Sequence, residues 1–504
     1  MTTTNPELIP VIVGVGQCND RPANLQEGLN STGLMEKALR LADIDAGRGW
    51  LADIDSLAVV KQISWPNLGD IATDLSSRFQ AHPRFSTTTP EASGDSPIRL
   101  LNDAANLIGC GSIKVAAIVG GEALRTAAQL AKAAAAVGEA ADYDPLRDAS
   151  AEVYAPGYRE KYGLAVPTDV YPLYENAGRK FYGQTLAEGQ AESATIWSNF
   201  AEVAKHNPAA WLRKGAAAEE IFTPSLSNRP IAHPYTKLMV ANSSVNQGAG
   251  FIVTSLAEAR RRGVAESKII YVGLGASAHE PEDVLARDRF FHSVSMETSI
   301  NTALRLNDLQ PQDLSFIELY SCFPCVPKMA RRILSWPASE PATVSGGLTF
   351  GGGPIGNYMS HTVASMVEKL RIEGRHGLLF ANGGLATHNH TIILSNSPVE
   401  GAEFPQDYDY QAQADSKRGK IPVVIEEYVG PATLETYTVL YNRDGSARSG
   451  VVVARTPEGA RTLAIVSAGD QAAIRLLTSG EVEAVGSTGV IESGLTGLRT
   501  WNCT

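Results

Sequence analysis

The chain repeats part of itself, and this internal repeat restricts the possible folds more than any other feature of the sequence. The run VIVGVG at 11–16 returns as IYVGLG at 270–275, and the paired glycines stand 273 − 14 = 259 residues apart. ALRLADI at 38–44 returns as ALRLNDL at 303–309, an offset of 303 − 38 = 265 residues. A third pair of segments begins at two prolines that lie 354 − 97 = 257 residues apart. Three matches in one order, at nearly one spacing, predict two copies of one structural unit.

Each copy has the pattern of an α/β unit. Apolar runs typical of strands alternate with helical patterns in the order strand, helix, strand, helix, strand. Such alternation is typical of layered sheets covered by helices. We therefore predict an α/β fold with two βαβαβ halves related by a pseudo-two-fold axis, at 1–268 and 269–404.

Two further regions have no counterpart in the repeat. Residues 126–234 are rich in Ala, Tyr, Glu and Lys, and we predict a mostly helical insertion there. Residues 419–504 contain short β-rich runs and a single helical run, which predict an additional small β-barrel of OB-like type. The polar stretch 404–418 is interpreted as a linker.

Composition excludes several classes of protein. The chain has 43 Lys and Arg against 54 Asp and Glu, a net charge of −11, so we expect no nucleic-acid partner. Five cysteines in 504 residues are too few for a disulfide framework. The N-terminal segment has no signal-peptide pattern, and no apolar run approaches the length of a membrane span. We expect a cytoplasmic protein, in which coenzyme A binding would need a local basic patch.

Three motifs point to a known family. ANSSVNQGAG at 241–250 is similar to the thiolase signature N-x-S-x-x-N-D-G-A-A, and GGLTFGGGPIG at 346–356 is similar to G-G-x-x-x-x-G-H-P-x-G. ELYSCFP at 318–324 stands where thiolases have N-E-A-F or H-D-C-F. On these motifs the chain resembles the thiolase superfamily over about residues 8–400, and its β-rich tail resembles the additional C-terminal domain of thiolase-like proteins type 1.

The resemblance implies an acetyl-CoA acetyltransferase-like protein that acts on or binds an acyl-CoA. Coenzyme A or acyl-CoA would then be a co-substrate, with no tightly bound cofactor. The resemblance places the expected nucleophilic cysteine at Gly94 (within one residue) and the general-base histidine at Gly353, and neither side chain is present. We therefore expect ordinary thiolysis to be absent or very slow.

The remaining candidates lie on loops that the duplicated fold would bring to one site. A thiol–imidazole pair would lower the pKa of Cys322, and backbone amides near Gly353 and Gly384 could stabilise an oxyanion. No cluster with metal-ligand spacing is present, so we predict no metal. The candidate catalytic residues are Cys322, His361, His388 and Tyr320. The candidate substrate-binding or CoA-binding residues are Ser243, Gly353, Asn357, Tyr358, Asn382 and Gly384.

Other interpretations stay open at this point. Cys322 also fits a small buried thiol, and with Cys325 it forms a C-x-x-C pair of the kind found in redox proteins. The protein as a whole could be a non-catalytic acyl-CoA or lipid carrier. It could also be a retro-aldol or retro-Claisen lyase that uses Tyr320 or Tyr358 as its acid or base. A small-molecule ligand is expected, and the chain could be a monomer or a homodimer.

Overall fold

The computed structural model describes residues 5–136, 157–494 and 497–503. Nine strands of this part form one sheet in the order β3-β2-β4-β7-β1-β8-β11-β10-β9. The bounds of these strands are β1 Pro10–Asn19, β2 Ser56–Val59, β3 Phe85–Thr88, β4 Val115–Glu122, β7 Gln247–Ser255, β8 Ile270–His279, β9 Leu314–Leu319, β10 His376–Gly383 and β11 His388–Ser395.

The two repeated strands lie at the centre of this sheet. β1 and β8 pair antiparallel, with Val11 opposite Tyr271 and Ile12 opposite Ile270. From this centre, β7, β4 and β2 follow on one side, and β11, β10 and β9 follow in the equivalent order on the other. The prediction of a duplicated α/β core is confirmed.

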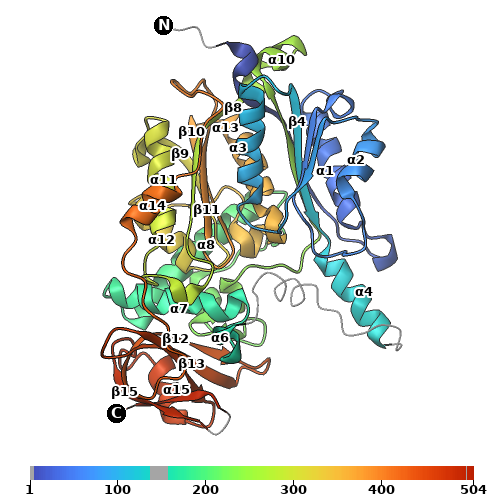
Figure 1. Cartoon of the computed structure of the whole chain (residues 1–504). Coiled ribbons are helices and arrows are strands. Elements are labelled where there is room, and N and C mark those ends of the chain that lie inside the picture. Colours follow the sequence, from blue (N-terminus) through green and yellow to red (C-terminus); the bar gives the residue numbers. More distant parts are fainter. Residues whose placement is uncertain (1–4, 137–156, 495–496, 504) are drawn as a thin grey trace.

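Each half of the sheet carries a helix on its outer face, and two further helices lie between the two halves. α1 (Ser31–Asp45) packs on β1, β4 and β7, and α11 (Val294–Leu306) packs on β8 and β11. α3 (Ser96–Gly109) and α13 (Tyr358–Leu370) lie between the halves and contact strands of both (Figure 1). Glycine in the repeated run allows close packing here, since a Cβ atom on Gly16 would lie 2.1 Å from the carbonyl oxygen of Ala38 in α1.

The region between β4 and β7 is largely helical. Its described elements are α4 Leu124–Ala136, α6 Tyr158–Lys161, α7 Pro167–Phe181, α8 Leu186–His206, α9 Ala218–Phe222, β5 Pro230–Ala232 and β6 Tyr235–Thr236. α7 packs against α12 (Cys325–Ile333), where Lys328 Nζ lies 2.5 Å from Glu175 Oε1 and both side chains are buried. This contact fixes the inserted helices to the segment that follows β9.

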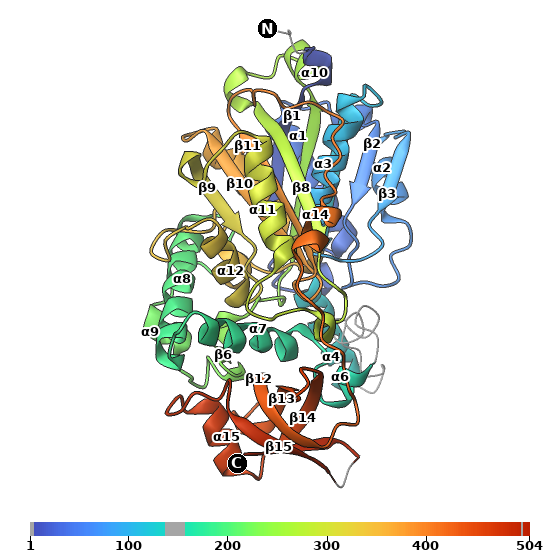
Figure 2. The same ribbon diagram turned by 60° about the vertical axis from the view of Figure 1, so that its left-hand side comes forward.

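The C-terminal strands close into a five-stranded barrel. Its elements are β12 Gly430–Tyr441, β13 Ala447–Arg455, β14 Arg461–Ser467, α15 Gln471–Thr478, β15 Thr488–Ser493 and β16 Arg499–Cys503. The strands pair in the cycle β12-β13-β14-β16-β15-β12, with β14 and β16 parallel and α15 between β14 and β15 in the chain. The small OB-like barrel is thus confirmed, and α7 lies between it and the core (Figure 2).

The stretch interpreted as a linker is an ordered strap along α3. Asn106 and Gln406 exchange two hydrogen bonds of 2.8 and 2.9 Å between side chain and backbone. Tyr408 donates to Asp103 at 2.6 Å, and its carbonyl accepts a hydrogen bond from Ser277 of β8 at 2.7 Å. α14 (Gln411–Lys417) then leads to the barrel. None of the described helices combines the length and the apolar character needed to cross a membrane.

Candidate functional site

The loops that precede α3 and α13 meet at the junction of the two halves. A Cβ atom on Gly356, just before α13, would lie 2.8 Å from the backbone of Ala92, just before α3. The N-terminal ends of both helices therefore lie at this junction. Helix N-termini carry partial positive charge, so the junction favours a carbonyl oxygen or an anionic group.

Tyr320 fills the space beside Gly94, the position at which the sequence resemblance places the thiolase nucleophile. A Cβ atom on Gly94 would lie 2.3 Å from the Tyr320 hydroxyl oxygen and 2.3 Å from the carbonyl oxygen of Asn382. Tyr320 is buried, and its backbone N–H donates to the carbonyl of Phe380 at 3.1 Å. No side chain, and thus no cysteine, fits at Gly94 unless both neighbours shift.

Tyr358 belongs to a buried hydrogen-bond network next to Tyr320. The two rings meet edge to face with centroids 5.7 Å apart. Tyr358 donates to Glu318 Oε1 at 2.7 Å, and Val344 N–H donates to the other carboxylate oxygen at 2.8 Å. Burial raises the pKa of Glu318 to about 7, although the hydrogen bond from Tyr358 lowers it. The Tyr358 hydroxyl is therefore fixed beside a carboxyl group that titrates near neutral pH.

Three of the predicted segments are joined by backbone hydrogen bonds. Ala241 N–H donates to the carbonyl of Cys322 at 3.0 Å, and Gly353 N–H donates to the carbonyl of Asn242 at 2.9 Å. Ser243 follows on the same loop and is partly exposed. The loop at 241–245 thus lies against both the Cys322 segment and the glycine-rich loop. Because the Gly353 amide already has an acceptor, it is not a free donor for an oxyanion.

Burial of the Cys322 thiol disfavours the nucleophilic role predicted for it. Cys322 is partly exposed as a residue, but burial of its sulfur raises the pKa to about 12, against a hydrogen bond from Tyr171 that lowers it. Cys325 is buried, and its pKa is also raised by burial. Both thiols therefore stay protonated at neutral pH, whereas nucleophilic and redox thiols need a lowered pKa.

The two candidate histidines point to other partners. His361 Nδ1 lies 3.0 Å from Gln17 Oε1 on β1, and burial lowers the pKa of this imidazole to about 3. His388 begins β11, and its Nε2 lies 3.5 Å from Glu282 Oε1. Within the described residues, no hydrogen bond joins Cys322 to either imidazole.

Tyr171 of the inserted helix α7 is a site residue that the sequence did not indicate. Its hydroxyl oxygen lies 3.2 Å from the carbonyl oxygen of Gly384 and accepts from Ala386 N–H at 2.9 Å, while its ring stacks on Phe323 at 4.4 Å. Asn382 Oδ1 also lies 3.4 Å from this hydroxyl. A tyrosine in an amphipathic helix carries no local signal of such a role, because the contact depends on how the insertion packs.

Asn357 is buried at the start of α13. Its Nδ2 donates to the carbonyl of Ala249 at 3.3 Å, and its Oδ1 has no hydrogen-bond partner in the described structure.

No group of three or more His, Cys, Asp or Glu side chains in the described part of the chain is placed to hold a metal ion.

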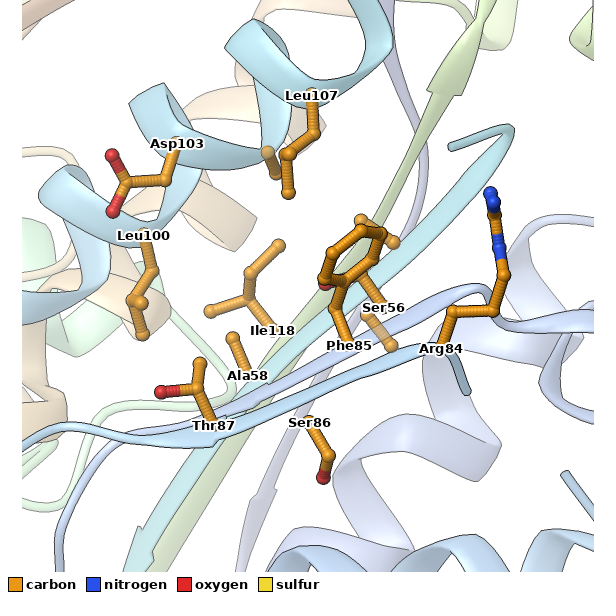
Figure 3. Close-up of a pocket in the computed structure, with 13 residues that line it drawn as sticks. Ser56, Ala58, Arg84, Phe85, Ser86, Thr87, Leu100, Asp103, Leu107 and Ile118 are labelled. Carbon is orange, nitrogen blue, oxygen red and sulfur yellow. The ribbon is translucent and has the colours of Figure 1, made fainter. Parts of the chain in front are cut away.

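A hollow of about 410 Å³ lies elsewhere, between α3 and the face of β2, β3 and β4 (Figure 3). Its floor is apolar, with Arg84 and Asp103 at opposite sides. The residues labelled there include Ala58, Phe85, Leu100, Leu107 and Ile118. No predicted site residue lines this hollow.

Comparisons with known proteins agree with the fold of the core and with the C-terminal domain. Residues 411–494 match the family model described as the thiolase-like protein type 1 additional C-terminal domain. No curated protein matches the chain. A monomeric SCP2-thiolase-like protein type 1 from Mycobacterium smegmatis is 28% identical, with a TM-score of 0.82 and 99% of each chain covered.

More distant structures share the fold. Human mitochondrial 3-ketoacyl-CoA thiolase, solved in complex with CoA, is 14% identical, with a TM-score of 0.58 over 78% of this chain and 99% of that one. A structure described as the Ltp2-ChsH2(DUF35) aldolase is 16% identical, with a TM-score of 0.59 over 78% of this chain and 100% of that one.

Proposed function

The chain has the thiolase fold and the additional C-terminal domain of the thiolase-like proteins type 1, and we propose that it binds an acyl-CoA thioester without performing thiolysis. One observation carries the proposal: Tyr320 and the Asn382 carbonyl fill the space that a nucleophile at Gly94 would need. The protonated Cys322 and the weakly basic His361 offer no replacement pair.

The architecture around this blocked position supports ligand binding. Two helix N-termini converge there, and the loop that contains Ser243 borders the glycine-rich loop. We assign Ser243 to the pantetheine arm, and Asn382 and Gly384 to the thioester end. The distant thiolase that binds CoA shows that this fold accommodates such a ligand. The ligand would be exchangeable, and the protein would act in the cytoplasm as a monomer or homodimer.

Two measurements test the proposal together. Thermal unfolding in the presence of CoA and acyl-CoAs should show stabilisation of about 2.7 kcal/mol at 100 times the dissociation constant. Thiolysis of acetoacetyl-CoA should be undetectable in the same preparation. An unchanged unfolding temperature at millimolar ligand would refute binding. Turnover on the order of 10 per second would refute the loss of thiolase chemistry.

A second candidate function is retro-aldol cleavage of a 3-hydroxyacyl-CoA. It is favoured by the Tyr320 hydroxyl, which lies next to Gly94 at the N-terminal end of α3, and by the shared fold with an aldolase. The hydroxyl proton of the substrate would pass to a base, the Cα–Cβ bond would break, and a carbonyl product would leave. The electron pair would form a thioester enolate, which takes up a proton at Cα.

Tyr320→Phe separates this candidate from simple binding, because it keeps the ring that packs on Gly94 and removes only the hydroxyl. If the lyase exists, the variant should lose release of the carbonyl product, measured by chromatography, and keep CoA binding. Wild-type protein that releases no carbonyl product from any 3-hydroxyacyl-CoA would leave binding as the function.

A further inference from the structure

Two arginines lie beside the loop that contains Ser243. Arg21 follows β1, and its neighbour Asp20 donates a backbone hydrogen bond to the carbonyl of Asn246 at 3.0 Å. Arg125 lies in the first turn of α4, and its N–H donates to the carbonyl of Val245 at 3.1 Å. Backbone hydrogen bonds at Asp20 and Arg125 therefore tie both arginine segments to the residues that follow Ser244.

Arg21 is also held against the glycine-rich loop. Its guanidinium lies over the ring of Trp211, 3.8 Å from the centroid, and donates to the Trp211 carbonyl. Trp211 N–H in turn donates to the carbonyl of Gly351 at 3.0 Å. A guanidinium fixed by an aromatic ring loses little freedom when it binds an anion.

Among the described residues, neither arginine has a carboxylate partner. In the described parts of the chain, no Asp or Glu forms an ion pair with Arg21 or Arg125, and both are exposed. Burial and the nearby charge of Arg125 lower the pKa of Arg21. An anion between the two guanidinium groups would relieve this repulsion.

We propose that Arg21 and Arg125 form a site for a phosphate or diphosphate group at the rim of the Ser243 loop. This inference rests on the proposed function, because the site would hold the phosphate-bearing end of a CoA-type ligand whose thioester end lies near Asn382. Guanidinium groups bind phosphate oxygens through paired, charge-assisted hydrogen bonds. A free diphosphate or nucleotide presents the same chemistry, so the test must separate the two sources.

Calorimetric titration with CoA, pantetheine and inorganic diphosphate makes this separation. The proteins are the wild type, Arg125→Gln, the double variant Arg21→Gln/Arg125→Gln, and Arg443→Gln as a control with the same charge change in an exposed turn of the barrel. Among the described residues the Arg125 side chain makes no hydrogen bond, ion pair or cation–π contact, so Arg125→Gln tests the site even if loss of Arg21 weakens the fold. We expect CoA binding to weaken several-fold in Arg125→Gln and about tenfold or more in the double variant. Pantetheine binding and the control should not change.

The affinities distinguish failure of the arginine site from failure of the proposed function. Equal wild-type affinity for CoA and pantetheine, or unchanged CoA affinity in the double variant, would overturn the arginine site while the proposed function stands. Wild-type protein that binds neither CoA nor pantetheine would overturn the proposed function. If diphosphate alone then still binds and the double variant abolishes it, the arginines serve a free phosphate ligand.

Discussion

At Gly94 the space for a side chain is taken by atoms of two other loops. The closest are the Asn382 carbonyl oxygen and the Tyr320 hydroxyl, both 2.3 Å from an ideal Cβ position. The absence of a cysteine at this place can be predicted from the sequence, because it depends on one motif. That the tyrosine directly after β9 fills the space could not be predicted, since it depends on the packing of residues 226 positions apart (320 − 94).

Gly94→Cys should therefore destabilise the protein and should not create a thiolase. The new side chain must displace a backbone carbonyl as well as a ring, and overpacking of this kind costs roughly 1–3 kcal/mol. The midpoint of urea denaturation measures the change. Gly178→Ala in α7 is a matched control, because its Cβ would meet no atom within 4 Å. We expect that variant to be stabilised by up to about 1 kcal/mol.

Cys322 should react more slowly with iodoacetamide than the exposed Cys110 and Cys503. At pH 8, a pKa of about 12 leaves about one Cys322 thiol in ten thousand ionised. Peptide mass spectrometry after timed alkylation of the native protein gives the order of reaction. Labelling of Cys322 before both exposed thiols would show that it is an activated thiolate after all.

The short helix α12 shows how an inserted element can be fixed by charge. Lys328 pairs with Glu175 of α7 in a buried contact, and its Nζ also donates to the Gly189 carbonyl at 2.7 Å. Removing one partner leaves the other charge buried without compensation. We expect Lys328→Met to lower the free energy of unfolding by about 3–5 kcal/mol, and the double variant Glu175→Leu/Lys328→Met to recover much of it.

An exposed ion pair in the barrel provides the control for this denaturation experiment. Arg475 and Glu481 form an ion pair at 2.7 Å, but their side chains are 70% and 62% exposed. Arg475→Ala should therefore change stability by less than about 1 kcal/mol. Equal effects of Lys328→Met and Arg475→Ala would mean that the buried pair does not hold α7 to α12.

Elements with a local signal were predictable, and those defined by distant contacts were not. The paired glycine runs identify β1 and β8 because in both strands a Cβ atom would clash with a neighbour, with the α1 backbone at Gly14 and Gly16 and with asparagine side chains at Gly273 and Gly275. The strap around Gln406 was interpreted as a linker because polar residues suggest exposure to solvent. The backbone N–H and carbonyl of Gln406 instead form hydrogen bonds with the side-chain amide of Asn106 on α3. Among the predicted site residues, Tyr320, Asn382 and the Ser243 loop gather at the junction, while His361 faces β1.

For the whole molecule, buried carboxyl groups make stability fall as the pH rises toward 7. Burial raises the pKa of Glu122 and Glu318 to about 7 from an ordinary value of 4.5. Between these two values the unfolded chain has lost the protons that the folded protein still holds. The free energy of unfolding therefore decreases with increasing pH in this window, by at most about 1.4 kcal/mol per pH unit for each group.

Buried histidines have the opposite effect on the acid side. Burial lowers the pKa of His233 and His361 to about 3 and that of His390 to about 4, from an ordinary value of 6.5. As the pH falls through 6.5, the unfolded chain takes up protons that the folded imidazoles do not. The free energy of unfolding therefore decreases with decreasing pH below about 6.5.

These two opposing effects place the maximum of stability near pH 6.5. Below it the protons taken up by three histidines of the unfolded chain outnumber those held by the two buried carboxyls, and above it the buried carboxyls, with the higher pKa, hold more protons than the unfolded histidines. Urea denaturation at half-unit steps from pH 5.5 to 8 measures the curve. Glu318→Gln should change the absolute stability and should also move the maximum to higher pH, so that stability rises instead of falling between pH 6.5 and 7.5, because the three histidines of the unfolded chain then outweigh Glu122. A curve that keeps rising to pH 8 in the wild type, or an unchanged slope in the variant, would mean that these carboxyls are already ionised in the folded protein.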